Sequence, residues 1–361
     1  MFFINSRIKM NNNSYFQQLN TLRFFAITFV IIEHFAHFIG NFFKAGYYGV
    51  DLFFVISGFL ITRSLISNKN EPKKTLSHFF YNRALRIFPI YYATIIFLLV
   101  INNKDAWDNH LFLLTYSYNY AWDYLQLETT QISHFWSLCV EEQFYLIWPF
   151  FIVMLRKKKT MMQLFIILII ILSGAQFAFG IFEKLLPFNS HSLFPRSYAL
   201  TIGALAATYS NRIDLNHIIL KNKYIEALLL ISLFGLLCFE QGYLMILLTP
   251  FLSVVLILKT LNGKFAINFI NKTMNNAKLQ HIGLVSYGIY IFHLPLATYL
   301  DSQVFNPIWY NYIPWEYFEI FSKIQYNPTI IRLPLYFYLN YKLATISYNF
   351  FESKILLYKI K

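Results

Sequence analysis

Long apolar runs separated by short polar clusters dominate this sequence. A helix needs about 20 apolar residues to cross the hydrocarbon core of a bilayer, and helices satisfy their own backbone hydrogen bonds there. The pattern therefore predicts an all-α, polytopic membrane protein. We read about ten spans, at residues 22–40, 47–66, 87–101, 136–155, 162–182, 194–209, 224–240, 243–258, 279–298 and 333–352.

The basic residues predict how these spans are oriented. If the N-terminus is cytoplasmic, 23 of the 30 Lys and Arg residues fall on the cytoplasmic side and six fall outside. Because cytoplasmic loops carry an excess of Lys and Arg, this asymmetry favours an even number of spans with both termini inside. We expect a short cytoplasmic segment at residues 1–19, an uncleaved first span, and one membrane domain over residues 20–361.

Composition narrows the class of protein further. The chain is 57% hydrophobic and only 13% charged, whereas a soluble domain carries about twice that charge. The net charge of +13 comes from clusters between apolar runs and not from one basic face, which argues against nucleic-acid binding. Cys139 and Cys238 both lie in apolar runs, so neither a disulfide framework nor a metal site is indicated.

Ionisable side chains interrupt the first two runs. Arg23 opens the first, and Glu33, His34 and His37 lie in its second half, while Asp51 stands near the start of the second. Such groups are costly in lipid unless they face a protein interior, which makes them functional candidates. Arg23 and His34 are eleven residues apart, so a helix places them on nearly one face, roughly 16 Å apart along its axis.

The second run supplies possible partners for this histidine. A helical hairpin would bring Asp51 towards His34 or His37, where a carboxylate fixes the imidazole tautomer and raises its basicity. Ser57 and Gly58 then form a small-residue step. This step lets a ligand approach the backbone or, more commonly, lets two helices pack closely.

Two further pairs of charged residues stand on other runs. Arg83 and Arg86 share a helix face at the cytoplasmic edge, where they serve as topology anchors or as a clamp for a phosphorylated ligand. Pro89 follows and would kink the helix enough to open a cavity. Glu141 and Glu142 lie near the outer edge of the fourth run. Two roles are open for them: a structural pairing with a basic residue, or the orientation of a basic histidine.

A further histidine, His293, lies in the outer half of the ninth run. A neighbouring carbonyl would satisfy a lone histidine of this kind. With His34 and His37 present a metal site has to be considered, but no H-x-x-x-H spacing supports it, so we expect no metal. The expected outer loops, 102–135 and 301–332, are rich in Trp and Tyr, which form an interfacial belt or stack on sugar rings.

At these residues the sequence resembles the acyltransferase-3 family of membrane acyltransferases. LNTLRFFAITFVIIEH is similar to the family's Arg-x10-His signature, with Arg23 and His34 in the key positions. YGVDLFFVISGFLIT resembles its Asp-Leu-Phe-Phe and Ser-Gly-Phe-Leu elements, and Arg83-Ala-Leu-Arg86 matches its R-x-x-R motif. FWSLCVEEQFYLIWP, RSYALTIGAL and SYGIYIFHLPL extend the resemblance over nearly the whole chain.

The sequence departs from the family pattern in two places. Asn20-Thr21 stands where many members have Asp-Gly, and the C-terminal Glu-x-Pro is replaced by Glu352-Ser353-Lys354, which puts a role for Glu352 in doubt. Some members carry a fused extracytoplasmic esterase-like domain, which we do not expect here.

The resemblance implies an O-acyltransferase of the bacterial cytoplasmic (inner) membrane. Acetyl-CoA or another acyl-CoA would be the donor, and a hydroxyl of a surface glycan or lipid-linked saccharide would be the acceptor. The protein would contact membrane lipid, and no metal would be required. His34 would be the general base or a transient acyl carrier. The other expected roles are phosphate binding for Arg23, Arg83 and Arg86, orientation of His34 for Asp51, Glu141 and Glu142, and the substrate channel for Ser57, Gly58 and His293.

Two other functions are compatible with the composition. A proton-coupled transporter would also use intramembrane histidines and carboxylates, although no inverted repeat is visible. A non-catalytic envelope scaffold would explain neither the Arg–His spacing nor the paired arginines. The acceptor stays open among lipopolysaccharide O-antigen, capsule, peptidoglycan, glycolipid and secondary metabolite, as do the length of the acyl group and a start at Met1 or Met10.

Overall fold

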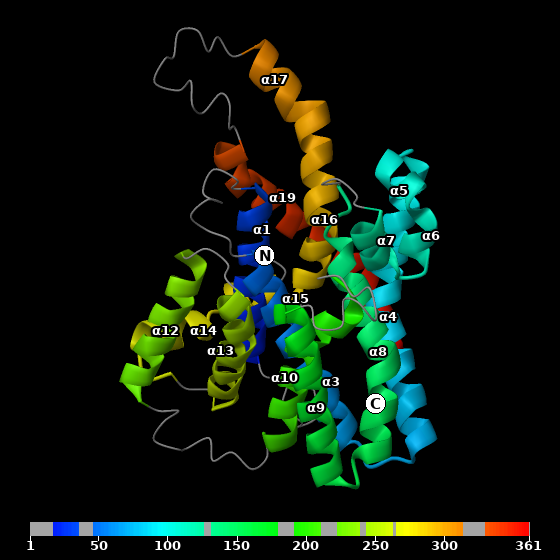
Figure 1. The fold of residues 1–361 in the computed structure, drawn as a ribbon. Helices are drawn as coiled ribbons and strands as arrows, with labels where there is room; N and C mark the ends of the chain where they lie inside the picture. Colours follow the sequence, from blue (N-terminus) through cyan, green and yellow to red (C-terminus); the bar gives the residue numbers. More distant parts are fainter. Residues whose placement is uncertain are drawn as a thin grey trace.

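The computed structural model describes residues 17–35, 46–125, 131–179, 191–210, 222–238, 243–262, 265–312 and 329–360 (Figure 1). Of these described residues, 88% are helical and none is in a strand. The expected all-α class is therefore confirmed.

The described part of the chain consists mainly of helices that follow one another along the sequence. In chain order they are α1 (Gln17–Phe35), α3 (Gly46–Ser67), α4 (Pro72–Val100), α5 (Lys104–Asp108), α6 (His110–Leu114), α7 (Tyr118–Tyr124), α8 (Phe135–Leu155), α9 (Lys159–Phe179), α10 (Leu193–Tyr209), α12 (Lys223–Cys238), α13 (Tyr243–Asn262), α14 (Asn268–Met274), α15 (Ala277–Leu284), α16 (Ser286–Leu300), η1 (Asp301–Phe305), α17 (Asn306–Asn311), α19 (Thr329–Ser347), η4 (Tyr348–Glu352), α20 (Ser353–Ile355) and η5 (Leu356–Tyr358).

The described part of each expected span is largely helical, but fewer helices have the length and hydropathy of a membrane span. Within the described ranges, α3, α4, α8 and α9 meet both criteria, and α15 with α16 makes a fifth if this bent pair counts as one. Large apolar side chains on their outer faces are exposed, as expected beside lipid; they include Phe97, Leu146, Met154 and Leu164. Ten spans and a cytoplasmic location of both termini stay predictions.

Two helices differ from the expected spans. Helix α4 begins at Pro72, well before residue 87, because a polar helix continues beyond the apolar part and Pro is favoured in the first turn. Arg83 and Arg86 therefore lie within a continuous helix and not at its start. The ninth run is broken after α15, where the chain bends by 67° before α16. His37 lies outside the described residues.

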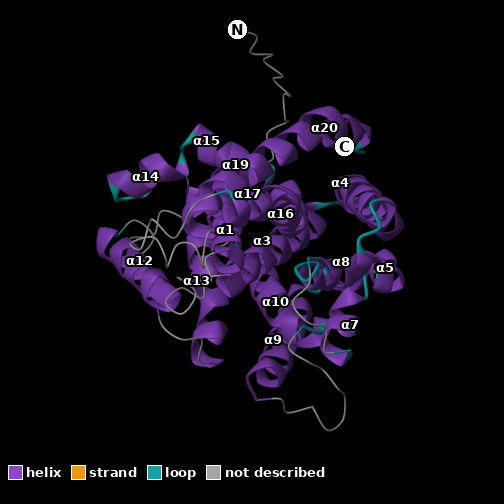
Figure 2. Ribbon diagram, turned by 90° about the horizontal axis from the view of Figure 1, so that it is seen from above, coloured by secondary structure: helices purple, strands orange, loops and turns teal. Residues whose placement is uncertain are grey.

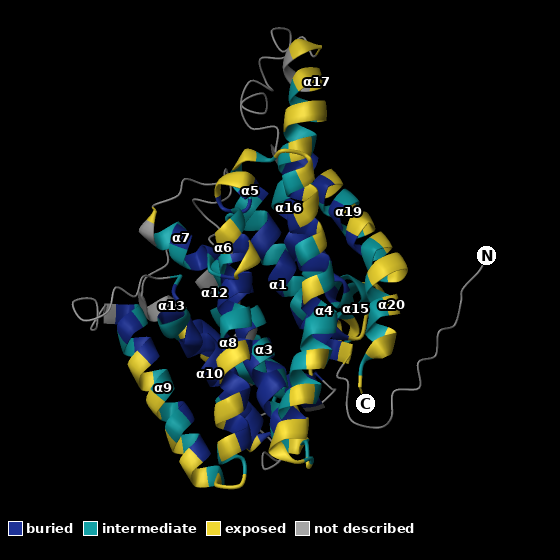
Figure 3. Cartoon of the chain, turned by 90° about the vertical axis from the view of Figure 1, so that its right-hand side faces the viewer, coloured by how far each residue is buried: buried dark blue, intermediate teal, exposed yellow. Residues whose placement is uncertain are grey.

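The view from above shows how the helices are arranged (Figure 2). Helices α1, α3 and α16 stand in the middle, with α4 and α8 on one side and α12 and α13 on the other. Buried residues face this centre, while exposed residues form outward stripes on α4 and α9 (Figure 3). The candidate residues of α1, α3 and α16 thus share the interior of the bundle.

Close contact between α3 and α10 depends on two glycines. A Cβ atom at Gly58 would lie 1.8 Å from the backbone oxygen of Leu200, and one at Gly203 would lie 2.1 Å from the backbone oxygen of Val55. The two helix backbones touch at reciprocal positions where no larger residue fits. Gly58 therefore serves helix packing in this fold.

Polar contacts join connections that the charge pattern assigns to one side. Arg156, after α8, donates to the backbone oxygens of Asn68 at 2.5 Å and Asn70 at 2.6 Å, both between α3 and α4. At the opposite ends of these helices, Asp123 contacts His191. This arrangement agrees with helices that alternate in direction.

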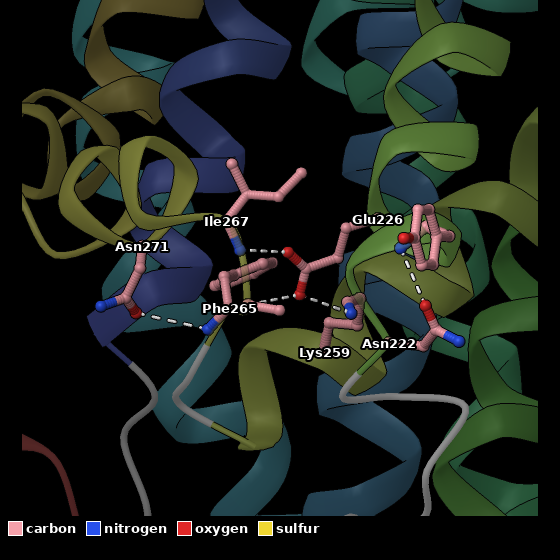
Figure 4. A network of polar contacts seen from close by, with 8 residues as sticks. Asn222, Glu226, Lys259, Phe265, Ile267 and Asn271 are labelled. Atoms are coloured by element: carbon pink, nitrogen blue, oxygen red, sulfur yellow. Dashed lines mark hydrogen bonds and ion pairs between the residues drawn. The ribbon is translucent and has the colours of Figure 1, made fainter.

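A buried ion pair joins the C-terminal part of α13 to α12 (Figure 4). The amine of Lys259 lies 2.7 Å from Glu226 of α12, and both side chains are 1% exposed. The same carboxylate accepts from the backbone nitrogens of Ala266 at 2.7 Å and Ile267 at 2.8 Å. Lys259 is thus held by its partner inside the protein, so it is a weaker topology signal than the sequence count assumes.

We expect Gly58→Ala to destabilise the fold by about 1–3 kcal/mol or more, because the added methyl group meets backbone that cannot move alone. The measurement is thermal unfolding of the purified protein in detergent. Val100→Ile also adds one carbon, but at a site that is 72% exposed, and should change the melting temperature little. Equal melting temperatures for Gly58→Ala and the natural protein would contradict the packing role.

Candidate functional site

Three arginines that are far apart in the sequence line one cavity inside the bundle. Arg23 comes from α1, and Arg83 and Arg86 come from one face of α4. The cavity has a volume of about 80 Å³, and Ser57 of α3 and Glu141 of α8 also line it. We call it the arginine cavity. It brings together five of the residues that the sequence singles out.

Carboxylates and an aromatic ring surround Arg83. Its guanidinium lies 3.6 Å from the ring centroid of Tyr145 and interacts electrostatically with both Glu141 and Glu142. Glu141 also accepts a hydrogen bond from Ser57 at 2.8 Å. Adjacent positions on a helix predict separate partners, but both glutamates act on this one arginine.

The same three arginines also line a second cavity. This cavity lies between α3, α4 and the C-terminal residues and has a volume of about 520 Å³. Its described lining holds Arg23, Arg83, Arg86, His78 and Lys359 and no carboxylate. We call it the polar cavity. Its walls favour a ligand with several negative charges.

A third cavity has a different character. It has a volume of about 630 Å³ between α4, α16 and α19, and apolar residues such as Phe97 and Phe292 line it. Its described lining includes neither a charged side chain nor a histidine. Acid–base chemistry therefore belongs to the other two cavities and their surroundings.

A pair of hydroxyls separates the arginine cavity from a group of histidines. Ser137 and Tyr290 both line the cavity, and their hydroxyl oxygens lie 2.6 Å apart. The Tyr290 hydroxyl also donates to the backbone oxygen of His134 at 3.2 Å. Directly behind this pair, the rings of His134 and His293 lie 4.5 Å apart between centroids. The Tyr290 ring, which lines the cavity, also packs against both imidazoles, 5.5 Å from His134 and 5.4 Å from His293 between centroids.

His34 contacts His293 directly. Nδ1 of His34 lies 2.9 Å from Nε2 of His293, and Nδ1 of His293 lies 2.6 Å from the backbone oxygen of Tyr290. His293 is 2% exposed. The two histidines that the sequence predicts for a catalytic and a channel role therefore form a hydrogen-bonded chain.

This chain assigns the proton on each ring. A backbone oxygen only accepts, so Nδ1 of His293 carries the proton, and Nε2 of a neutral His293 is then an acceptor. Nδ1 of His34 must donate to it, which leaves the basic lone pair of His34 on Nε2. The arrangement resembles other histidines whose function depends on a partner that fixes the tautomer.

Asp51 has a partner that the hairpin argument does not predict. Its carboxylate lies 3.5 Å from Arg196 of α10, and both side chains are nearly fully buried. The Arg196 guanidinium is also surrounded by the rings of Tyr47, Trp136 and Phe177, at 4.7–5.1 Å from their centroids. Arg196 is a charged residue near the end of an apolar run, which is the signal that would have identified it.

A second ionisable pair lies at the same end of the bundle, outside the expected spans. Nδ1 of His191 lies 2.6 Å from Asp123, and the His191 ring packs against Trp136 with centroids 4.6 Å apart. Burial lowers the pKa of His191, although the hydrogen bond with Asp123 acts in the opposite direction. This pair attaches the start of α10 to α7.

The predicted site residues therefore fall into three groups. Arg23, Arg83, Arg86, Ser57 and Glu141 share the arginine cavity, with Glu142 beside Arg83, and His34 and His293 form the histidine pair. Asp51 and Gly58 lie against α10. The sequence prediction did not include His134, Arg196 and Tyr290 among the site residues. In the described part of the chain, no group of three or more His, Cys, Asp or Glu side chains is placed to hold a metal ion.

Comparison with known sequences shows which protein family has this sequence pattern. The acyltransferase domain profile of the acyltransferase-3 family matches residues 16–339. The chain belongs to this family. The match covers both arginine motifs and both histidines of the pair, and with the apolar helices it makes the chain an integral membrane protein.

Curated relatives of this acyltransferase-3 chain include a putative peptidoglycan O-acetyltransferase, YrhL of Bacillus subtilis, 24% identical over 98% of this chain and 58% of that protein. O-acetyltransferase OatA of Staphylococcus aureus is 35% identical over 40% of this chain and 26% of its own length. A putative O-acetyltransferase of S. aureus strain COL is 26% identical over 88% and 57%. The chain thus spans little more than half the length of the relatives it matches most fully. No solved structure matches it.

We expect His34 and His293 to be neutral with the proton on Nδ1, because Tyr290 offers only an acceptor to this chain. Nitrogen NMR of protein labelled with ¹⁵N-histidine distinguishes this tautomer from the Nε2–H form. His34→Phe and His293→Phe spectra assign the two signals. Nε2–H signals from both residues would contradict the chain.

Proposed function

We propose that this acyltransferase-3 chain transfers an acetyl group from cytoplasmic acetyl-CoA to a hydroxyl of an envelope glycan. The observation that carries the proposal is a succession of three features: the arginine cavity, the Ser137–Tyr290 hydroxyl pair that lines it, and the hydrogen-bonded pair of His34 and His293. A donor that enters from one side of the membrane would have its phosphates at the arginines and its thioester farther in, towards the histidines.

The arginines would bind the donor. Guanidinium groups match phosphate geometry and stay charged when buried. Arg23, Arg83 and Arg86 line both cavities, so the CoA phosphates would lie in the polar cavity while the pantetheine arm extends past the arginines. Glu141 and Glu142 would then position Arg83.

His34 would act on the acceptor. Its Nε2 takes the proton of the acceptor hydroxyl as that oxygen attacks the thioester carbonyl, and the CoA thiolate then leaves and is protonated. His293 is a positioning residue here, because it fixes the tautomer that makes Nε2 the base. Transient acetylation of His34 remains the alternative route, and acid quenching of enzyme with labelled acetyl-CoA and no acceptor would reveal acetyl-histidine.

The remaining predicted residues would shape the path. Ser57 holds Glu141 in the cavity wall, and Asp51 orients Arg196 at the opposite end of α3 from the phosphate site. Gly58 lets α10 approach. Asp51 would thus contribute indirectly, by holding α3 against α10 and keeping Arg196 beside Trp136 of α8.

The acceptor we propose is a glycan at the outer face of the bacterial cytoplasmic membrane. All three relatives described above are named as O-acetyltransferases, and the one that aligns with nearly the whole chain is named for peptidoglycan. Peptidoglycan is therefore the first acceptor to test, before the O-antigen of lipopolysaccharide.

We expect His34→Gln to lower acetyl transfer at least 100-fold, because a positioned base contributes about 10²–10⁴ to the rate. Binding of acetyl-CoA should be unchanged, since His34 does not line either arginine-containing cavity. The assay follows label from acetyl-CoA into glycan in membranes that contain equal amounts of each variant.

His110→Gln is the matched control, because His110 lies at the start of α6, outside the cavities described above, and contacts Trp107 of the neighbouring α5. Transfer at the natural rate by His34→Gln would exclude His34 as the base. Absence of label in glycan with the natural protein would instead favour a transporter.

A further inference from the structure

The end of the chain forms part of the polar cavity. After η4, the segment Ser353–Ile360 turns back along α4, and Figure 2 shows the C-terminus beside α20 and α4. Lys359 and Ile360 line the polar cavity together with Arg23, Arg83 and Arg86. We call Ser353–Ile360 the tail.

One side chain of α4 holds the tail in this position. The Asn82 amide donates to the backbone oxygen of Ile360 at 2.8 Å and accepts from the backbone nitrogen of Ile360 at 2.8 Å. A primary amide that pairs in both directions with one residue fixes its backbone much as a strand neighbour would. Asn82 itself lines the cavity directly before Arg83.

The tail adds positive charge where positive charge is already concentrated. Four cationic side chains line the polar cavity, and no carboxylate is among its described lining residues. Carboxylates outside this lining offset part of the positive charge: Glu142 interacts with Arg83, and Glu352 interacts with Arg86. Burial and the nearby Arg86 and Arg83 lower the pKa of Lys359 to about 8.

An unpaired donor in the same wall supports a ligand with acceptor oxygens. Nε of Arg83 is buried and has no hydrogen-bond partner. Repulsion among like charges costs free energy in the empty cavity, and a phosphate group removes that cost while accepting several hydrogen bonds. The acyl donor carries such groups at its 3′-phosphate and its diphosphate.

We propose that the tail is a functional part of the donor site, in which Asn82 places Lys359 as a further phosphate ligand beside the arginines. This inference rests on the proposed use of acyl-CoA. The tail then couples donor binding to the position of the C-terminus, because a detached tail removes one cation from the cavity.

The test measures equilibrium binding of CoA to the full-length protein in nanodiscs of zwitterionic lipid, which removes anionic headgroups as competing ligands. We expect Lys359→Gln to weaken CoA binding about tenfold, which corresponds to about 1.4 kcal/mol. Asn82→Ala should weaken it to a similar degree, and Lys359→Arg should restore it. Lys354→Gln, which removes an exposed tail lysine outside the cavity, should bind as the natural protein does.

The pH dependence gives a second readout. Lys359 is protonated below its pKa of about 8, so its contribution to CoA binding is complete near pH 6.5 and is lost as the pH rises towards 9.5. His78 is the other titratable side chain that lines the cavity; it is present in both the natural protein and Lys359→Arg, so it does not contribute to the difference between them. Affinity of the natural protein should therefore fall between pH 7 and 9, while that of Lys359→Arg should not.

Dephospho-CoA identifies which group Lys359 contacts. If the penalty of Lys359→Gln disappears with dephospho-CoA, the partner is the 3′-phosphate; if it persists, the partner is the diphosphate. Natural-strength CoA binding by Lys359→Gln with an unchanged melting temperature would overturn the role of the tail and leave the proposed function intact. Absence of CoA binding by the natural protein would instead overturn the proposed donor.

Discussion

Positive charge inside a helical bundle is the condition on which the rest of this structure depends. A buried guanidinium needs compensation from opposite charge, hydrogen bonds or aromatic faces. Arg83 has Tyr145, Glu141 and Glu142 around it. Arg196 shows the same solution at the opposite end of α3, with Asp51 and three aromatic rings. Helix α8 supplies groups to both, so its register against α3 determines whether either cation is tolerated.

The close approach of α3 and α10 fixes the register of a second pair of helices, α3 against α10. Gly58 and Gly203 allow backbone to meet backbone, and a helix that touches its neighbour at main-chain distance cannot slide without a clash. Ser57, one residue earlier on α3, faces the arginine cavity and holds Glu141. Packing and chemistry thus occupy adjacent positions on one helix, which explains why a small-residue step stands in an otherwise bulky apolar run.

Local sequence rules were sufficient where the site depends on one helix, and insufficient where it depends on contacts between helices. Eleven-residue spacing placed Arg23 and His34 on one helix, and three-residue spacing placed Arg83 and Arg86 on one face. The partner of Asp51 was sought in the neighbouring helix, but Arg196 is distant in sequence. Likewise nothing local indicates that His293 lies 2.9 Å from His34. Apolarity marked the lipid-embedded stretch of α4 but not its polar beginning, and it did not reveal the bend between α15 and α16.

The two cavities share Arg23, Arg83 and Arg86, and this has an energetic meaning. An anion that moved between separate binding sites would lose its ligands, regain water, and shed it again. Here the same three cations line both spaces, so ligands can be exchanged one at a time while the total coordination of the anion stays nearly constant. The free-energy profile along this stretch is consequently shallow, and a bound anion can shift its position without being trapped or released.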